Sequence, residues 1–354
     1  MASEGSIYKI KSGRHKGKWA AQITIGKDPE TGQPKRKYFY GKTKTEVKEK
    51  LQQYKDMMNL GINQEEAKRL TYGEWLLEWL ELYKRPTLRT STYENYYMYS
   101  QKHIIPAIGH IPLCRLDTND IQILYNKLKD AGKAPATIHK IHQIIHSSLE
   151  KAVDKRLLAW NPSKATEKPS VKAKREVKAM SEEDMKKFLD IVYQQPPKWK
   201  AAFLTLLGTG LRVGELLALE WQDIDLDKGI LNVRHTLSRT KSKGLILEEP
   251  KTEKSKAPVP IPEEVIAALK EHRKVQLEII LYKGQEYKNK NLVFGTDNGT
   301  YMYPRNFQRK YYALREKAGI GKTINLHSLR HTYATRLLEQ GENLKVVQEL
   351  LRHS

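Results

Sequence analysis

The sequence predicts a multidomain α+β protein: a three-stranded sheet with one helix, then a helical bundle, then a mostly helical domain with a small antiparallel sheet. Its 354 residues are enough for two or three domains of typical size. Apolar and polar residues alternate near the start of the chain, whereas most later segments repeat apolar residues every three or four positions. The first pattern is typical of strands and the second of amphipathic helices.

The first domain is expected at residues 1–69. SIYKIKSG, KWAAQITIGK and KRKYFYGK alternate in polarity, and the turn-like DPETGQP separates the last two, so three meandering strands are predicted. A helix over TKTEVKEKLQQYKDMMNLG follows, with Thr43 or Thr45 as its cap and Gly61 at its end.

Residues 70–160 are expected to form the helical bundle. Four segments carry helical spacing, and Ser91, Thr118 and Thr137 are candidate caps at three of their starts. The only cysteine, Cys114, rules out an internal disulfide, and we expect it to pack in the core.

A basic linker and a last domain complete the chain. Residues 161–179, rich in proline and lysine, predict an extended linker that lets its two neighbours close on one DNA duplex. The domain at 180–354 begins with the capping pattern SEEDMKKFLDIV, headed by Ser181. Helices then flank short strands around GILNVRHT, LILEEPKT and SKAPVPIP.

Charge indicates the partner. The chain has 63 Lys and Arg against 41 Asp and Glu, a net charge of +22, which predicts binding to a polyanion. No stretch approaches the roughly 18 apolar residues of a membrane span, and no signal segment opens the chain. We therefore expect a cytoplasmic, nucleoid-associated bacterial protein that binds double-stranded DNA.

One predicted strand combines cations and aromatic rings. Lys35, Arg36 and Lys37 stand beside Tyr38 and Tyr40. Such a strand can meet phosphates and base edges from a sheet, and the alternative is a solvated charged strand. Lys35, Arg36, Lys37 and Tyr40 are the candidate DNA-binding residues.

The last domain contains residues suited to phosphodiester chemistry. Arg212 in TGLRVGEL opens a helix, with Glu215 three residues on to steady its guanidinium. In LHSLRHTYATRL, His327 and Arg330 share a helical face, and His353 follows on the next helix. Forked guanidiniums match phosphate oxygens and stabilise the charge of a pentacovalent transition state, while histidine can move protons.

Two histidine patterns have the spacing of metal sites. His139, His142 and His146 lie three and four apart but gain no carboxylate or thiolate, so DNA contact or packing is favoured. His327 and His331 have zinc-helix spacing, but Arg330 between them would repel a cation. We expect no metal and no cofactor.

The motifs TGLRVGELLAL, LHSLRHTYATRLLEQG and VVQELLRHS closely resemble those of the tyrosine recombinase (phage-integrase) family, and the three-segment layout resembles integrases of conjugative transposons. The resemblance implies that Arg212 and Arg330 grip the scissile phosphate, His327 assists proton transfer and His353 hydrogen-bonds the phosphate. It also implies a hairpin lysine as acid, for which Lys251 matches best and Lys254 is the reserve.

The resemblance further implies the reaction: cutting and rejoining of DNA through a 3′-phosphotyrosyl intermediate, by four protomers on two sites of a mobile element. The first domain would bind arm sites and the bundle core sites, and an excisionase or DNA-bending protein is a candidate partner. The alternative is a non-cleaving DNA-binding regulator on the same scaffold, although a binding module does not need the whole catalytic set.

Two departures from the family pattern concern the end of the chain. Arg352 stands where the family usually has glycine before the second histidine, which either disturbs that helix start or adds a phosphate contact. The family's nucleophile is a tyrosine beyond that histidine, and Tyr333 is instead expected to pack. We therefore expect this chain, with a truncated catalytic domain, to lack the nucleophile and to bind DNA without cleaving it.

Overall fold

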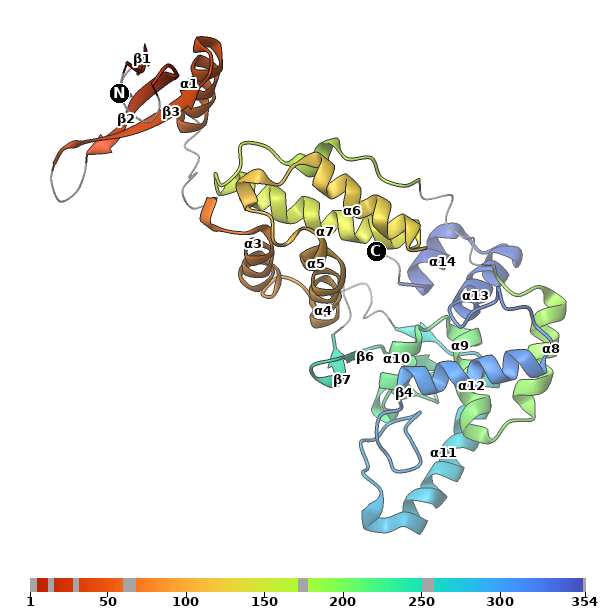
Figure 1. The fold of residues 1–354 in the computed structure, drawn as a ribbon. Coiled ribbons are helices and arrows are strands. Elements are labelled where there is room, and N and C mark those ends of the chain that lie inside the picture. The colour runs from red at the N-terminus through yellow and green to blue at the C-terminus, as the bar shows by residue number, and fades with distance from the viewer. Residues whose placement is uncertain are drawn as a thin grey trace. The chain divides into compact units, whose positions relative to one another are not determined.

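The computed structural model describes residues 5–11, 16–27, 32–59, 68–170, 178–249 and 258–352. The chain divides into two compact units, Met1–Lys172 and Ala173–Ser354. Helices predominate in both, and each small sheet is antiparallel, so the predicted α+β class is confirmed (Figure 1). No helix in these ranges is long and apolar enough to cross a membrane.

The first unit begins with the predicted meander. Its strands pair in the order β1-β2-β3, with bounds β1 (Ser6–Lys9), β2 (Trp19–Lys27) and β3 (Pro34–Gly41). Helix α1 (Lys44–Asn59) packs Val47 and Leu51 against Ala21 and Ile23 on one face of this sheet (Figure 1). Thr43 accepts a hydrogen bond from the Glu46 backbone at 3.2 Å, as predicted for a cap, whereas Gly61 lies outside the described residues.

The bundle of the first unit surrounds two tryptophans. Trp75 and Trp79 are almost completely buried among isoleucine and leucine side chains from the other helices. The helices are α3 (Tyr72–Trp79), α4 (Thr90–Tyr99), α5 (Ile105–Ile108), α6 (Thr118–Asp130) and α7 (Pro135–Asp154), and π-helical segments continue α3 over Leu80–Lys84 and α4 over Ser100–Ile104.

The predicted caps in the bundle are wrong by a few residues. Asp117, not Thr118, caps α6, because its carboxylate accepts from the backbone of Asp120, whose own carboxylate accepts in return. Helices α4 and α7 start one and two residues before the predicted Ser91 and Thr137, and neither has a side-chain cap.

Cys114 is exposed, so its predicted place in the core is wrong. It lies in the 3₁₀ turn Leu113–Arg115. Leu113 and Leu116, three positions apart and on one side of the turn, occupy the core instead.

The chain after α7 folds back onto the bundle. Asn161 and Ser163 are buried, and a 3₁₀ turn forms at Pro162–Ala165. The backbone of Glu167 donates to the side chain of Gln122 in α6 at 2.8 Å. The first ten residues of the predicted linker are therefore ordered against the bundle, because their polar groups find partners there.

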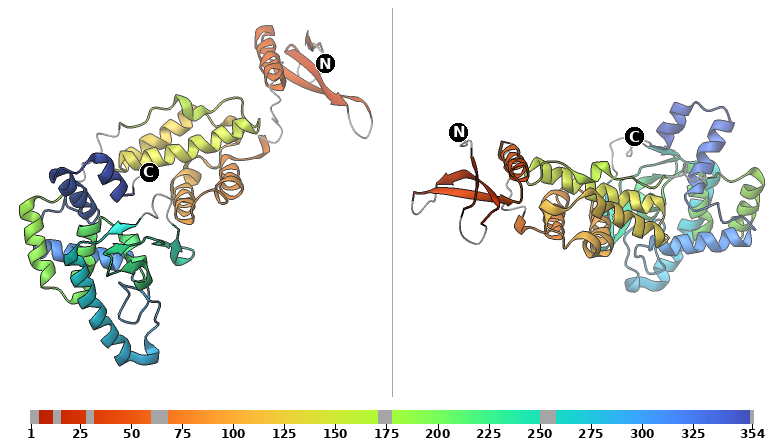
Figure 2. Two further views of the ribbon diagram at one scale, coloured as in Figure 1. Left: turned by 180° about the vertical axis from the view of Figure 1, so that it is seen from behind. Right: turned by 45° about the horizontal axis from the view of Figure 1, so that its top comes forward.

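The second unit has helices around small antiparallel sheets. Strands β4 (Ile224–Asp225), β5 (Ile230–Leu231) and β8 (Val259–Pro260) form one sheet, and β6 (Thr236–Thr240) and β7 (Gly244–Glu248) form a hairpin. The helices are α8 (Glu182–Tyr193), α9 (Pro197–Thr209), α10 (Val213–Ala218), α11 (Glu263–Lys283), α12 (Pro304–Lys317), α13 (Ser328–Glu339) and α14 (Leu344–Leu350) (Figure 2). Ser181 caps α8 by accepting from the Asp184 backbone, as predicted.

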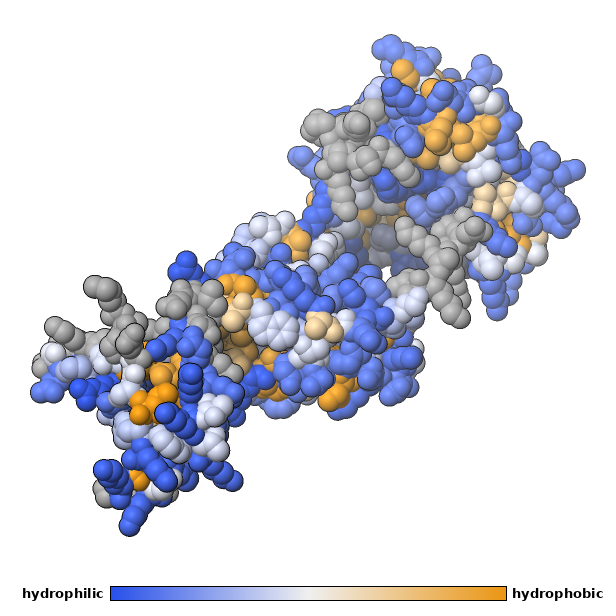
Figure 3. Space-filling model, turned by 90° about the horizontal axis from the view of Figure 1, so that it is seen from above, coloured by the Kyte–Doolittle hydropathy of each residue, from blue (hydrophilic) through white to orange (hydrophobic). Residues whose placement is uncertain are grey.

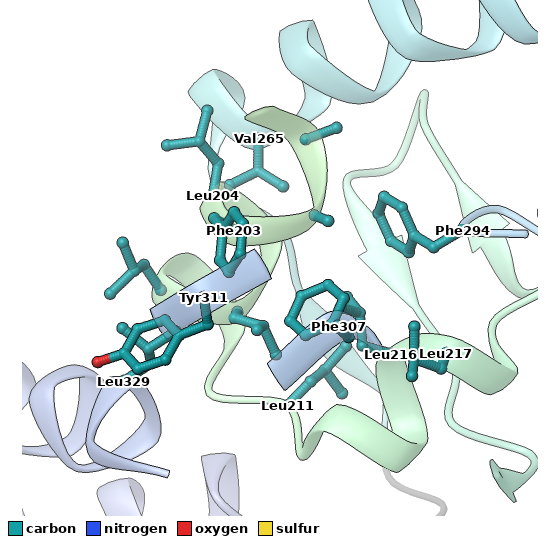
Figure 4. Close-up of a cluster of buried hydrophobic side chains, with 14 of the residues drawn as sticks. Phe203, Leu204, Leu211, Leu216, Leu217, Val265, Phe294, Phe307, Tyr311 and Leu329 are labelled. Atoms are coloured by element: carbon teal, nitrogen blue, oxygen red, sulfur yellow. The ribbon is translucent and has the colours of Figure 1, made fainter. Parts of the chain in front are cut away.

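The core of this unit holds both predicted arginine segments in place. Phe203 of α9 lies 5.0 Å from Phe307 of α12, centroid to centroid, at the middle of the cluster in Figure 4. Leu211 and Leu216, on either side of Arg212 in the sequence, are buried in this cluster, and so is Leu329 beside Arg330 (Figure 4). Burial of these apolar neighbours holds the backbone positions of Arg212 and Arg330 in place.

Candidate functional site

Arg212 stands at the N-terminus of α10, as its spacing predicts. Its backbone N–H and its Nη1 donate to the two carboxylate oxygens of Glu215, at 2.9 Å and 2.8 Å. Its side chain is 42% exposed, so the other guanidinium donors can reach a ligand. Gly214 makes this helix start compact, because a Cβ there would lie 2.7 Å from the carbonyl oxygen of Leu237 in β6.

Arg330 comes from α13 and is only 4% exposed. Its Nη1 donates to the carbonyl oxygen of Gly210 at 2.6 Å, and its Nη2 donates to that of Leu351. Burial, then the positive charge of Arg212, lowers the pKa of Arg330 to about 10. The guanidinium therefore stays charged at neutral pH, close enough to Arg212 for the two cations to interact.

Glu215 is shared between two arginines. Besides Arg212, it accepts from Nη2 of Arg352 at 2.8 Å, and both side chains of this second pair are almost fully buried. Burial alone would raise the pKa of the Glu215 carboxyl, but the charge of Arg352 and the hydrogen bonds and charge of Arg212 hold it below its usual value. Glu215 is therefore an anion that orders two cations.

His327 lies at the N-cap of α13, exposed, while Arg330 three residues later points into the interior. The predicted shared face therefore separates into an exposed histidine and a buried arginine. The ring of His327 packs edge-on against His331, 4.8 Å between centroids. Burial and the charge of Arg330 lower the pKa of His331, which favours a neutral ring beside the arginine.

Three predicted site residues, Lys251, Lys254 and His353, lie outside the described residues. Their roles stay predictions. The described hairpin β6–β7 precedes the two lysines in sequence, and β6 packs on α10, the helix that Arg212 opens. The ring of Tyr333 also packs closely against Gly210. The sequence does not predict this contact, because the two residues are distant along the chain.

The three histidines of α7 contact protein groups. His142 Nδ1 lies 2.9 Å from the hydroxyl of Tyr125, and His146 Nδ1 lies 3.0 Å from that of Ser163. His139 Nε2 is 2.9 Å from the carbonyl oxygen of Pro169. The described ranges contain no cluster of three or more histidine, cysteine or acidic side chains that could hold a metal.

The sheet of the first unit divides the predicted DNA-binding residues between its faces. Tyr8, Tyr38 and Tyr40 are each about two-fifths exposed. The register places Tyr8, Ala20 and Tyr40 in one row, and Tyr38 and Arg36 in the next rows on the same face. We call Tyr8, Arg36, Tyr38 and Tyr40 the open sheet face.

Lys37 belongs to the opposite face. It pairs in register with the core residue Ile23, and its Nζ lies 4.5 Å from the centroid of the Tyr54 ring of α1. Lys35 has the same parity along β3 and therefore falls on the helix side as well. Hydrophilic side chains otherwise dominate the surface seen in Figure 3, with small hydrophobic patches between them.

Comparison with known proteins gave family matches for both units. Residues 178–354 match the phage integrase family, and residues 71–129 match the phage integrase N-terminal SAM-like domain. A tyrosine recombinase XerC-like protein of Caldanaerobacter subterraneus subsp. tengcongensis is 35% identical over 349 residues, covering 94% of this chain and 88% of the relative.

Solved structures resemble the fold. A complex of the Tn1549 transposon integrase with a circular intermediate DNA superposes with a TM-score of 0.70 at 22% identity, covering 80% of this chain and 92% of that one. A lambda integrase tetramer bound to a Holliday junction gives a TM-score of 0.61 at 19% identity, covering 98% and 95%.

Proposed function

This chain belongs to the phage integrase family of site-specific DNA recombinases, and we propose that its Arg212 and Arg330 bind the phosphate that is cut. The observation that carries the proposal is the meeting of these two guanidiniums. Arg330 binds the carbonyl group of Gly210, two residues before Arg212, across 120 positions of sequence. Two cations held this close without an equal number of carboxylates suit an anionic ligand.

The chemistry needed from this pair is charge stabilisation. When a tyrosine oxygen attacks the phosphorus, negative charge grows on the non-bridging oxygens, and the guanidiniums offset it. The 5′ oxygen leaves and takes a proton, for which Lys251 is the proposed donor, and the 3′ phosphate becomes joined to the tyrosine. His327, which is exposed and lies three residues before the buried Arg330, is the proposed residue that assists proton transfer.

We propose separate DNA contacts for the first unit. The open sheet face would bind arm-type sites, since it combines Arg36 with three exposed tyrosines, and the bundle would bind the core site. The lambda integrase tetramer on a Holliday junction supports assembly of four protomers. We further propose that an excisionase or a DNA-bending protein is a partner, and that the protein is associated with the bacterial nucleoid.

The test uses nicked duplexes carrying the end sequence of the encoding element. This chain, and an extended version that adds whatever the native reading frame encodes after Ser354, are incubated with the labelled duplexes and separated under denaturing conditions. A covalent product with the extended version only, abolished by Arg212→Gln and by Arg330→Gln but not by Tyr333→Phe, supports the proposal and the predicted absence of the nucleophile here.

Other outcomes have definite meanings. A covalent product from this chain that Tyr333→Phe abolishes makes Tyr333 the nucleophile and overturns the packing role predicted for it. Specific binding with no covalent product from either version supports the non-cleaving regulator. Arg336→Gln is the matched control, because this arginine of α13 pairs with Glu339 at 2.9 Å and not with Glu215.

A further inference from the structure

Arg352 combines an unfavourable backbone with a buried charge. It follows Leu351, the C-cap of α14, and has φ of 54°, a left-handed conformation that L residues with side chains rarely adopt. Its side chain is only 1% exposed. The backbone conformation at this position suits glycine, yet the residue is an arginine whose whole side chain is buried. Such backbone strain is often found at functional sites.

The contacts of Arg352 link Arg212 and Arg330, the two proposed phosphate-binding arginines. Its Nη2 donates to Glu215 Oε2 at 2.8 Å, the carboxylate that also receives Arg212. Its backbone follows Leu351, whose carbonyl oxygen accepts from Arg330. Because Arg330 also binds Gly210 just before Arg212, the contacts form a closed ring through both proposed phosphate ligands.

The charges in this ring do not balance. Three guanidiniums, those of Arg212, Arg330 and Arg352, surround one carboxylate, that of Glu215. Two of the three cations are almost fully buried. Nε and Nη1 of Arg352 also have no hydrogen-bond partner within the described residues. Buried cations and donors without partners are costly, so the ring is suited to a site that gains an anion.

Sharing Glu215 also changes what Arg212 can do. Without Arg352, the negative charge of Glu215 would be offset by Arg212 alone. With Arg352 on Oε2, part of that field is taken up inside the protein. The exposed guanidinium of Arg212 then keeps more positive potential for a ligand while Glu215 still holds its orientation.

We propose that Arg352 is a positioning residue for the scissile phosphate, which offsets the charge of Glu215 so that Arg212 meets the phosphate as an oriented and uncompensated cation. This inference rests on the proposed function of Arg212 and Arg330. It assigns to Arg352 no contact with the DNA itself.

The experiment is a cycle between Arg352 and one phosphate charge. A core-site duplex of the encoding element is made with its natural backbone and with a neutral methylphosphonate at the cleavage position. Dissociation constants for both duplexes are measured with the wild-type chain and with Arg352→Gly, Arg352→Gln and Arg352→Lys. Arg336→Gln is again the control for loss of one positive charge.

For the wild-type chain, the Arg352→Lys variant and the control, we expect the methylphosphonate to weaken binding about tenfold, as for loss of one charge-assisted contact. For Arg352→Gly and Arg352→Gln we expect a factor of about three or less, because Arg212 is then neutralised by Glu215. Glycine suits the backbone at this position, so a folded Arg352→Gly protein is expected, as thermal unfolding will check.

The two proposals fail differently. Equal weakening by the methylphosphonate in the wild type and in both neutral variants overturns the role of Arg352 and leaves the phosphate site intact. If the methylphosphonate weakens binding in none of the proteins, the proposed binding of the phosphate by Arg212 and Arg330 is overturned, and the inference about Arg352 with it. If both neutral variants unfold, the Arg352→Lys and wild-type responses decide. Weakening by the methylphosphonate that is as strong in the lysine variant as in the wild type supports the proposed charge role of Arg352, and clearly smaller weakening overturns it.

Discussion

Arg330 donates a hydrogen bond to the carbonyl oxygen of Gly210, and this contact joins the two arginine segments of the second unit. Gly210 ends α9 in the left-handed conformation, with φ of 61°. The side chain of Tyr333, one helical turn beyond Arg330, packs directly on it. The position of Arg330 is thus set by the backbone that leads to Arg212, the other proposed phosphate-binding residue.

Replacing Gly210 with alanine should damage both stability and the site. The new Cβ would lie 2.5 Å from Cδ1 of Tyr333, in a conformation that is already unfavourable for alanine. We expect the free energy of unfolding to fall by about 2–3 kcal/mol, with a loss of DNA cleavage by the extended chain. Urea denaturation and the covalent assay measure the two effects.

Gly319→Ala is the control for this prediction. Gly319 has φ of 69° but no atom within 4 Å of its Cβ position, so it isolates the backbone cost, about 1 kcal/mol. Equal losses in the two variants would contradict a role for the contact with Tyr333.

Glu215→Gln should leave Arg212 and Arg352 without their shared carboxylate. Breaking a buried ion pair by removing one partner costs about 3–5 kcal/mol, and we expect a fall in unfolding free energy in this range. Added phosphate should restore thermal stability more in this variant than in the wild type, because the excess positive charge attracts an anion. Differential scanning calorimetry with and without phosphate measures this.

Glu339→Gln removes a carboxylate from an exposed pair with Arg336 and serves as the comparison. Exposed pairs contribute about 0–1 kcal/mol, so this variant should unfold almost like the wild type. A similar small effect for Glu215→Gln would mean that the buried ring does not order the site.

The open sheet face should govern salt-dependent arm binding. Arg36→Gln is expected to reduce the slope of log K against log salt by about one, as for the loss of one phosphate contact. Lys37→Gln should change the slope little, since Lys37 lies over Tyr54 on the helix-covered face. Titrations of an arm-site duplex at several salt concentrations distinguish the two variants. A larger change in slope from Lys37→Gln than from Arg36→Gln would place the DNA on the helix-covered face and contradict the prediction.

His142 should make the bundle sensitive to acid. Burial lowers the pKa of its ring to about 4 in the folded protein. The unfolded chain therefore binds the proton first, and stability that is complete above about pH 6.5 is lost as the pH falls toward 4. The loss at pH 5 should be at most about 2 kcal/mol from this group.

Hydrogen exchange of α7 amides at pH 7 and pH 5 measures this dependence. His142→Gln should reduce it, whereas His110→Gln, at an exposed histidine, should not. An NMR titration of the His142 ring with a pKa near 6.5 would contradict the prediction.

Alternation along β3 could have divided the DNA-binding candidates correctly. Successive strand residues point to opposite faces, so Arg36 and Lys37 could not share one surface. Charge and aromatic content identified the strand, while the hydrophobic set Ala21, Ile23 and Phe39 indicated which face is covered. The alternation along β3 was therefore the signal that could have assigned Arg36 and Lys37 to opposite faces.

Cap positions and Cys114 show a different limit. Asp117 and Thr118 are adjacent and both suit a cap, and the reciprocal bond with Asp120 decides between them. Cys114 is a small apolar residue next to Leu113, and only the path of the 3₁₀ turn exposes it. Neighbours along the chain do not fix which of several adequate residues takes a place.

The sequence by itself determined the three-stranded meander, the helical bundle, the family motifs and the contact of Arg212 with Glu215. All of these depend on local periodicity or on spacing within one helical turn. Only the tertiary structure decided that Arg330 binds Gly210 and that Arg352 shares Glu215 across 137 positions. Such pairings arise from the packing of whole helices against one core, and no short stretch of sequence encodes which distant side chains that packing brings together.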